Sequence, residues 1–541
     1  MPGPRRGRGA SSDRRSESCA WAKVLGFKGR AHHSPAAGLR DRAIDARPSI
    51  RADSAAMSLN ARLKKRFDWL RPIDEMEVAL VRAATERPAG LDGRRLEVLR
   101  YALNLARLDA VPAPGGDVLV GAALTPFRER LVMTLRPWIS ETPGVVDLEE
   151  LSAVTERVAT ITLRARAELL RTFAALLPEE VLEREVCEKA LVVVAGGGGG
   201  AGYVYGGAFQ LIDEVGRPPS MIVGTSIGSL LGLFRAKRQT MELAPLVSLS
   251  ESLTWRNVFL RPRVKNRYGV PAALRLYLRK AIGHLFQHEG GERTLRMGEL
   301  EIPFRVVVAG VYGGGLTHDL DYYEHLMDDV MASERVSWST IRKTVGAAVG
   351  VLSEFVQRPA VLKEIVLGGD ELTSQFDVVD AVGFSTAVPG LIHYDILRED
   401  PHMHAMMERL MEKHGVARLI DGGLVNNVPS RVAWTHVQRG DIGTRNAFIL
   451  AMDCFAPQLA RNLLMHPVQR LVRPQVSANA AFASFTKTFS NVLSPLDVVP
   501  DLKKIQVALR NGYAEMDTER RFLTAILRPL DPRAVAAFTS T

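Results

Sequence analysis

Cysteine is scarce in this chain of 541 residues, and long apolar runs are missing from it. Its three cysteines, Cys19, Cys187 and Cys454, lie far apart and fit neither a disulfide framework nor a metal-site spacing. Such sparing use of cysteine favours a cytoplasmic protein. Because no stretch of about 18 apolar residues occurs, the sequence predicts no transmembrane helix, and any membrane association is expected to be peripheral.

The first 56 residues lack hydrophobic periodicity and are rich in arginine, serine, glycine and alanine. They hold 12 Lys and Arg against 5 Asp and Glu, and so carry most of the net charge of +10. We expect a disordered basic tail over residues 1–56, able to touch an anionic membrane surface. The rest is close to neutral, so no nucleic-acid partner is expected. The tail resembles a transit segment only loosely, and Met57 is an alternative start.

Hydrophobic periodicity divides the remaining chain into three parts. Apolar residues three and four apart predict a helical N-terminal region over residues 57–187. Short β-branched runs then alternate with helical stretches, which predicts an α/β domain over residues 188–455. From residue 456 to residue 541 the pattern predicts a helical C-terminal region. Strands of the α/β domain are expected at 190–195, 220–226, 304–311, 418–420 and 446–454.

Five consecutive glycines, residues 196–200, follow the strand expected at 190–195 and precede a helix. Together with Gly202 they satisfy the G-x-G-x-x-G pattern of a phosphate-binding loop. A dinucleotide site would also need a carboxylate at the end of the next strand, where residues 224–226 are Gly-Thr-Ser. The second interpretation is an oxyanion hole, in which backbone amides at a helix N-terminus bind the negative oxygen of a tetrahedral intermediate.

The G-x-S-x-G sequence at residues 224–228 supplies the nucleophile that an oxyanion hole requires. Gly224 and Gly228 permit a sharp turn between strand and helix that exposes the hydroxyl of Ser226, and the amide of Ile227 adds a donor. Because both motifs end neighbouring parallel strands, we expect the glycine loop and Ser226 to lie side by side. Alone, the sequence is also compatible with an incidental turn of small residues.

No histidine stands in a sequence context that suits a general base for this serine. The histidine-rich stretch at residues 401–415 is expected to be a surface helix, and no acid or cysteine completes a metal site there. Asp421 follows a short apolar strand, and Gly422 and Gly423 permit a tight turn that aims its carboxylate at the edge of the sheet. An ordinary Asp-Gly turn is the alternative interpretation.

Taken together, these motifs resemble those of the patatin-like phospholipase family. The matching segments are GGGGAG at 197–202, GTSIG at 224–228 and DGGLVNNVP at 421–429, with softer matches in GFSTAVPGLI at 383–392 and FRVVVAGVYGGGLTH at 304–318. The resemblance covers roughly residues 188–455. It implies a three-layer α/β/α fold with a mostly parallel central sheet, flanked here by helical segments.

The resemblance also implies a serine lipid acyl hydrolase with a Ser–Asp dyad and no catalytic histidine. Ser226 would attack the ester carbonyl, and Asp421 would accept its proton and then activate water. The implied oxyanion donors are the backbone amides of Gly197, Gly198 and Gly199. Neither a metal nor a cofactor is implied. The expected partner is a lipid substrate, which could be a phospholipid, a lysophospholipid or an acylglycerol.

One position departs from the family pattern. Members usually carry Lys or Arg immediately before the last glycine of the oxyanion motif, where this chain has Ala201. The missing charge leaves open a slower enzyme, a different head-group preference or a member that only binds lipid. A non-catalytic nucleotide-binding or lipid-binding protein that uses the glycine loop is therefore the alternative function.

Apolar residues recur at helical spacing over residues 270–286, with arginine and lysine between them. This pattern predicts an amphipathic helix that lies either on a membrane interface or against the domain, and we favour packing against the domain. No feature of the sequence specifies an oligomeric state.

Overall fold

The structure is a computed structural model. It describes residues 50–139, 146–252, 259–260, 267–314, 351–352, 354–355, 357–456 and 466–538. The chain divides into two units, residues 1–59 and 60–541. Of the first unit only the helical residues 50–59 are described, so the tail expected over residues 1–56 lies almost wholly outside the described residues. The last four residues of the softer match at 304–318 also lie outside them.

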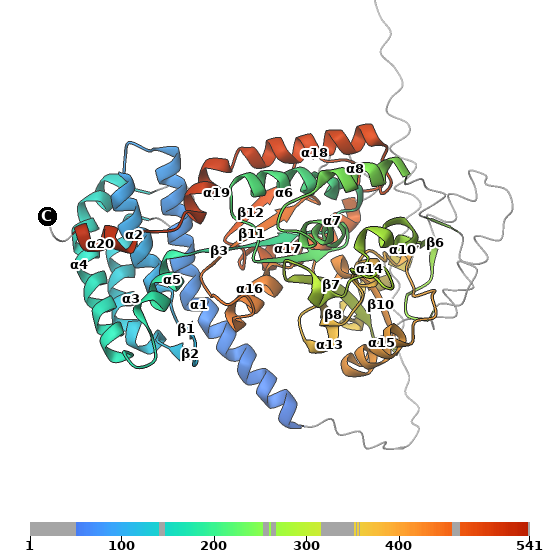
Figure 1. Ribbon diagram of the computed structural model, residues 1–541, viewed down its shortest axis with the longest axis horizontal. Coiled ribbons are helices and arrows are strands. Elements are labelled where there is room, and N and C mark those ends of the chain that lie inside the picture. The colour runs from blue at the N-terminus through green and yellow to red at the C-terminus, as the bar shows by residue number, and fades with distance from the viewer. Residues whose placement is uncertain are drawn as a thin grey trace, which may run out of the picture. The chain divides into compact units, whose positions relative to one another are not determined.

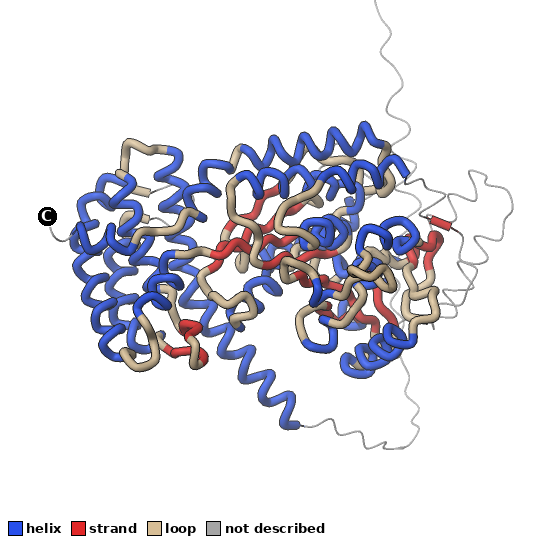
Figure 2. The backbone as a smooth tube through the Cα atoms, in the orientation of Figure 1, coloured by secondary structure: helices blue, strands red, loops and turns tan. Residues whose placement is uncertain are grey.

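A central, mostly parallel sheet forms the core of the second unit (Figures 1 and 2). Its strands are β3 (Ala190–Ala195), β4 (Met221–Thr225), β7 (Phe304–Val311), β8 (Leu362–Leu367), β10 (Arg418–Asp421), β11 (Ala447–Asp453) and β12 (Phe485–Thr488). The order is β10-β7-β4-β3-β11-β12, with β8 paired to β7. Strands β10 and β8 run antiparallel to β7, and the other pairs are parallel.

Helices cover both faces of this sheet. In β3, Leu191 and Val193 belong to a hydrophobic core shared with α6 (Val204–Glu214) and α7 (Ile227–Ala236). Val192 and Val194 point to the opposite face and join the core of α16 (Ser430–Arg439). Because successive side chains of a strand point to opposite faces, a continuous apolar run is what a sheet buried on both sides requires. The predicted three-layer α/β/α class is confirmed.

The N-terminal helices build a hydrophobic core of their own. They are α1 (Ile50–Glu86), α2 (Gly93–Ala106), α3 (Gly121–Leu135), α4 (Leu148–Thr172) and α5 (Glu179–Cys187), joined by the C-terminal α20 (Pro532–Phe538). A hairpin of β1 (Ala110–Ala113) and β2 (Gly116–Leu119) lies between α2 and α3 of this region.

A buried ion cluster joins these helices to the sheet. The ammonium group of Lys189, one residue before β3, lies 2.9 Å from the carboxylate of Glu77 on α1. It also donates to the side-chain oxygen of Asn446, one residue before β11, at 2.7 Å. The guanidinium of Arg100 on α2 contacts the same Glu77 and donates to the carbonyl of Ile526. Charges this deeply buried are tolerated because each has a partner.

The prediction of an amphipathic helix over residues 270–286 is wrong. Residues 270–286 form β6 (Ala272–Leu276) and a short helix α10 (Leu278–Ile282) rather than one amphipathic helix. Strand β6 pairs with β5 (Phe259–Leu260) and β9 (Gly390–His393), and this pairing overrides the helical spacing. In the C-terminal region, β12 lies between the helices and extends the sheet beside β11.

Further helices complete the described part of this unit. They are α8 (Leu243–Ser252), α13 (Glu371–Ser374), α14 (Val378–Ser385), α15 (Pro401–His414), α17 (His466–Ala480), α18 (Leu502–Asp517) and α19 (Arg520–Leu527). Within the ranges that the structure describes, no helix combines the length and the apolar character needed to cross a membrane.

Candidate functional site

The two residues of the expected dyad meet because two strands end head to head on β7. Strand β4 runs parallel to β7 and its last residue, Thr225, pairs with Val307. Strand β10 runs antiparallel to β7 and its last residue, Asp421, pairs with Val308. Strand β8 pairs with β7 along residues 306–311 and so occupies one edge of β7. Strands β4 and β10 therefore share the other edge, one after the other. The residue after β4, Ser226, therefore faces the carboxylate that ends β10.

Ser226 and Asp421 are joined by a hydrogen bond. The Ser226 hydroxyl donates to Asp421 Oδ2 at 2.7 Å, and the backbone amide of Gly423 donates to Asp421 Oδ1 at 2.6 Å. Both side chains are nearly inaccessible, with 8% and 5% of their surfaces exposed. A side chain on Gly422 would overlap the carbonyl oxygen of Val307, so the turn that aims the carboxylate needs glycine at that position.

Ser226 has a strained backbone. Its φ of 53° makes it the only non-glycine residue with positive φ in the part of the chain that the structure describes. Such a conformation costs about 1–3 kcal/mol and persists where surrounding contacts hold it. Two hydroxyls do so here. The Ser226 amide donates to Ser385 Oγ at 2.9 Å, and the Ser229 hydroxyl donates to the Ser226 carbonyl at 2.6 Å.

Glycine is needed at positions 224 and 228 because the backbone leaves no room for a side chain there, and not because the residues adopt a positive φ. A side chain on Gly224 would overlap the backbone of Ser229, and one on Gly228 would overlap the carbonyl of Ala195 in the neighbouring strand. The turn after β4 can therefore pack against the end of β3 only with glycine on both sides of the serine.

The glycine loop leaves some amides free and uses others. The amide of Gly197 donates to the carbonyl of Asn427 at 3.0 Å, so it is not available to an oxyanion. The expectation that Gly197 is an oxyanion donor is therefore wrong. The amides of Gly198, Gly199 and Ile227 donate to no group within the described ranges. Gly198 and Gly199 line the same cavity as Ser226, with φ of +55° at Gly199.

Close packing explains the other glycines of the loop. A side chain on Gly202 would overlap the side chain of Ile227, which follows the serine. Side chains on Gly199 and Gly200 would overlap backbone oxygens of residues 494–497. The run of glycines thus lets the loop pass between the serine turn and a segment from the far end of the chain.

The environment of Asp421 makes it a better base than an ordinary carboxylate. Its burial raises its pKa to about 6, and the hydrogen bonds from Ser226 and Gly423 act in the opposite direction. A group whose pKa lies near the working pH takes up and returns a proton most effectively.

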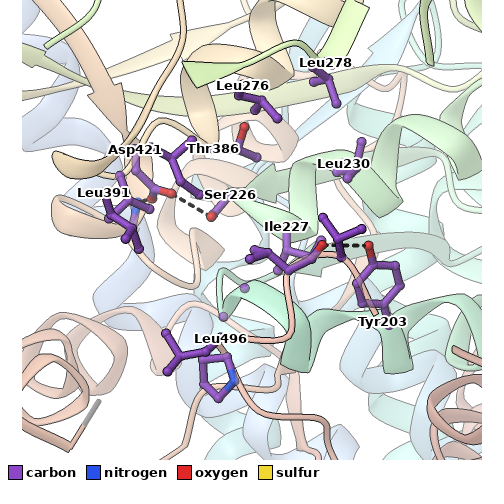
Figure 3. A pocket seen from close by; sticks show the side chains of 18 of the residues that line it. Tyr203, Ser226, Ile227, Leu230, Leu276, Leu278, Thr386, Leu391, Asp421 and Leu496 are labelled. Carbon is purple, nitrogen blue, oxygen red and sulfur yellow. Dashed lines mark hydrogen bonds between the residues drawn. The ribbon is translucent and has the colours of Figure 1, made fainter. Parts of the chain in front are cut away.

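A largely apolar cavity of about 200 Å³ opens at this dyad (Figure 3). Ile227, Leu230 and Phe234 line it from one face of α7, three and four residues apart. Leu276 and Leu278 come from the stretch expected to be an amphipathic helix, so its apolar side faces this cavity. Of the lining residues in the described ranges, none is Lys, Arg or His.

The histidine-rich stretch lies elsewhere. It forms α15, as expected, with His402 exposed and His404 half-buried. His404 Nδ1 lies 2.9 Å from the hydroxyl of Tyr268. Across the described residues, no group of three His, Cys, Asp or Glu side chains is arranged to hold a metal ion.

Several residues of the site were not identified from the sequence. Ser385 falls within the softer match at 383–392, which was the available signal for it. Asn427 falls within the third motif and lines the cavity. Residues 495–499 also form part of the cavity wall, but no sequence motif in that stretch indicates that it lies beside the distant Ser226.

Residues 192–434 match the family model described as patatin-like phospholipase. All three motifs, with Ser226 and Asp421, lie inside the matched range. No curated protein matches the chain.

Proposed function

We propose that the chain hydrolyses carboxylic esters of lipids with Ser226 as nucleophile and Asp421 as base, because residues 192–434 match the patatin-like phospholipase family model. The family consists mostly of lipid hydrolases. The observation that carries the proposal is the 2.7 Å hydrogen bond between the hydroxyl of a strained serine and a buried carboxylate, both of which line an apolar cavity.

In the first step the Ser226 oxygen attacks the ester carbonyl carbon while its proton passes to Asp421 Oδ2. The carbonyl oxygen becomes an oxyanion, which accepts hydrogen bonds from the amides of Gly198, Gly199 and Ile227. The serine turn and the glycine loop are held by backbone contacts, so these donors need little rearrangement during the reaction.

In the second step the tetrahedral intermediate collapses, and the leaving alcohol takes the proton from Asp421. This leaves an acyl group on Ser226 and an ionised carboxylate beside it. A water molecule then gives its proton to Asp421 and attacks the acyl carbon, and the second collapse releases the fatty acid and returns the proton to Ser226. One carboxylate thus serves both half-reactions, as a Ser–Asp dyad requires.

The cavity supports an acyl chain as the buried part of the substrate. Its lining is mainly aliphatic, and among the described lining residues the one acidic group is Asp421 itself. A phosphate placed inside would meet no cation on those residues and would lose its hydration, which is costly. We therefore place the acyl chain in the cavity and the head group, charged or not, outside it.

A fluorophosphonate probe tests the proposal. The wild-type protein should be labelled and should hydrolyse lipid esters, whereas Ser226→Ala should do neither. Ser152→Ala on α4 is the matched control and should behave like the wild type. Turnover that survives in Ser226→Ala contradicts the proposal. A wild-type protein that binds lipid or nucleotide without being labelled supports the non-catalytic alternative instead.

A further inference from the structure

Part of the cavity wall lies outside the range that matches the family. The match ends at residue 434, but Pro495, Leu496, Val498 and Val499 line the cavity beside Ser226. They belong to the connection between β12 and α18, more than 250 residues after the serine in the chain. Figure 3 shows Leu496 across the site from Leu276 and Leu278.

This connection touches the glycine loop directly. The amide of Gly200 donates to the carbonyl of Pro495 at 3.0 Å. The Tyr203 hydroxyl, at the end of the loop, donates to the carbonyl of Val498 at 3.2 Å. The carbonyl of Pro495 therefore holds the amide of Gly200 in place. Because Gly200 directly follows Gly198 and Gly199, this bond also sets the direction in which the amides of those two residues point.

The connection is itself anchored to α18. The amides of Ser490 and Asn491 donate to the carboxylate of Glu515 at 2.9 and 2.7 Å. Helix α18 in turn packs backbone to backbone on α6, because side chains on Gly207 and Gly512 would overlap main-chain oxygens of the opposite helix. The wall is therefore supported by the helix that follows the glycine loop.

We propose that residues 494–499 complete the site: the carbonyl of Pro495 positions the oxyanion loop, and Leu496 contacts the acyl chain at the solvent-exposed edge of the cavity. Leu496 is 46% exposed although it lines the cavity, so its side chain lies at the boundary between cavity and solvent. An acyl chain longer than a few carbons would cover it and bury its apolar surface. This inference rests on the proposed function and names a residue that selects its substrates.

Substitution at Leu496 tests the role of this residue. Leu496→Asp should lower kcat/KM for p-nitrophenyl laurate by roughly tenfold, because a charge would then border the buried chain. Hydrolysis of p-nitrophenyl acetate, whose acyl group is too short to reach the rim, should change by less than about twofold. Leu496→Ala should shift the same ratio in the same direction by a smaller factor.

Leu176→Asp is the matched control, since Leu176 is a 62% exposed leucine in the N-terminal helical region. It should leave the laurate-to-acetate ratio unchanged. The inference is overturned if Leu496→Asp lowers kcat/KM equally for both esters, or if neither Leu496 variant lowers it for laurate. The proposed function still stands in that case, provided that the wild type hydrolyses the esters and Ser226→Ala does not. A wild type that hydrolyses neither ester overturns both.

Discussion

The hydroxyl of Ser226 donates to the carboxylate of Asp421 across the point where two strands end head to head on a third. The residues are 195 positions apart in the chain. Their contact depends on β10 running antiparallel to β7, because a parallel β10 would carry its carboxyl end away from Val308. This arrangement explains how a carboxylate can contact the serine without an intervening histidine.

The pKa of Asp421 sets the acid limb of activity. Burial raises this pKa to about 6, and the proposed mechanism needs the ionised form. We expect kcat/KM to fall as the pH drops through about 6 and to level off above it. A pH–rate profile on a neutral, soluble ester checks this. Full activity near the ordinary aspartate pKa of 3.8 would contradict it.

The same burial makes ionised Asp421 a cost to stability. Its pKa is raised from 3.8 to about 6 on folding, so the folded state binds the proton more tightly. The resulting stabilisation is present below pH 3.8 and is lost as the pH rises through about 6. Asp421→Asn, which carries no charge, should therefore be more stable than the wild type near neutrality, by about 2–3 kcal/mol for a shift of this size.

Urea unfolding of the two proteins at several pH values measures this difference. The gap should be largest near neutrality and should narrow at acid pH, while hydrolysis by Asp421→Asn stays absent. An Asn variant that is less stable than the wild type at every pH would show that the charge is well accommodated. Ser374→Ala, a half-exposed residue at the end of α13, serves as the control for substitution itself.

Ser385 positions the nucleophile without touching the substrate. It accepts from the Ser226 amide at 2.9 Å and donates to the carbonyl of Val307 at 2.7 Å. Ser385→Ala would leave a buried amide unpaired, which costs about 1–3 kcal/mol, and would loosen the strained turn. We expect kcat to fall about tenfold or more with KM nearly unchanged, because the loss concerns the direction of the hydroxyl.

Ser385→Thr keeps the hydroxyl and should restore part of kcat. Steady-state kinetics on one soluble ester, together with the melting temperature, separates this role from general destabilisation. A rise in KM with kcat intact, or equal activity in the Ala and Thr variants, would argue against positioning.

The sequence by itself determined the elements that depend on local pattern. The β-branched runs at 190–195 and 304–311 became β3 and β7 with the expected bounds, because a strand buried on both faces must be apolar at every position. The residues that meet at the site, Ser226 and Asp421, stood out for a similar reason. Ser226 directly follows a short apolar strand and Asp421 ends one, and glycines stand close to both in the sequence.

Only the tertiary structure decided what depends on partners far away in the chain. Residues 272–276 belong to a stretch with the apolar spacing of a helix but form a strand that pairs with β9. The amide of Gly197 looks like its neighbours in sequence, yet the carbonyl of Asn427 occupies it. The wall at residues 495–499 has no local signature, because its importance comes from a hydrogen bond to a loop some 300 positions earlier. Local sequence patterns determine which side chains of a strand or helix are apolar. The packing of the whole chain determines which distant segment those side chains and the backbone then contact.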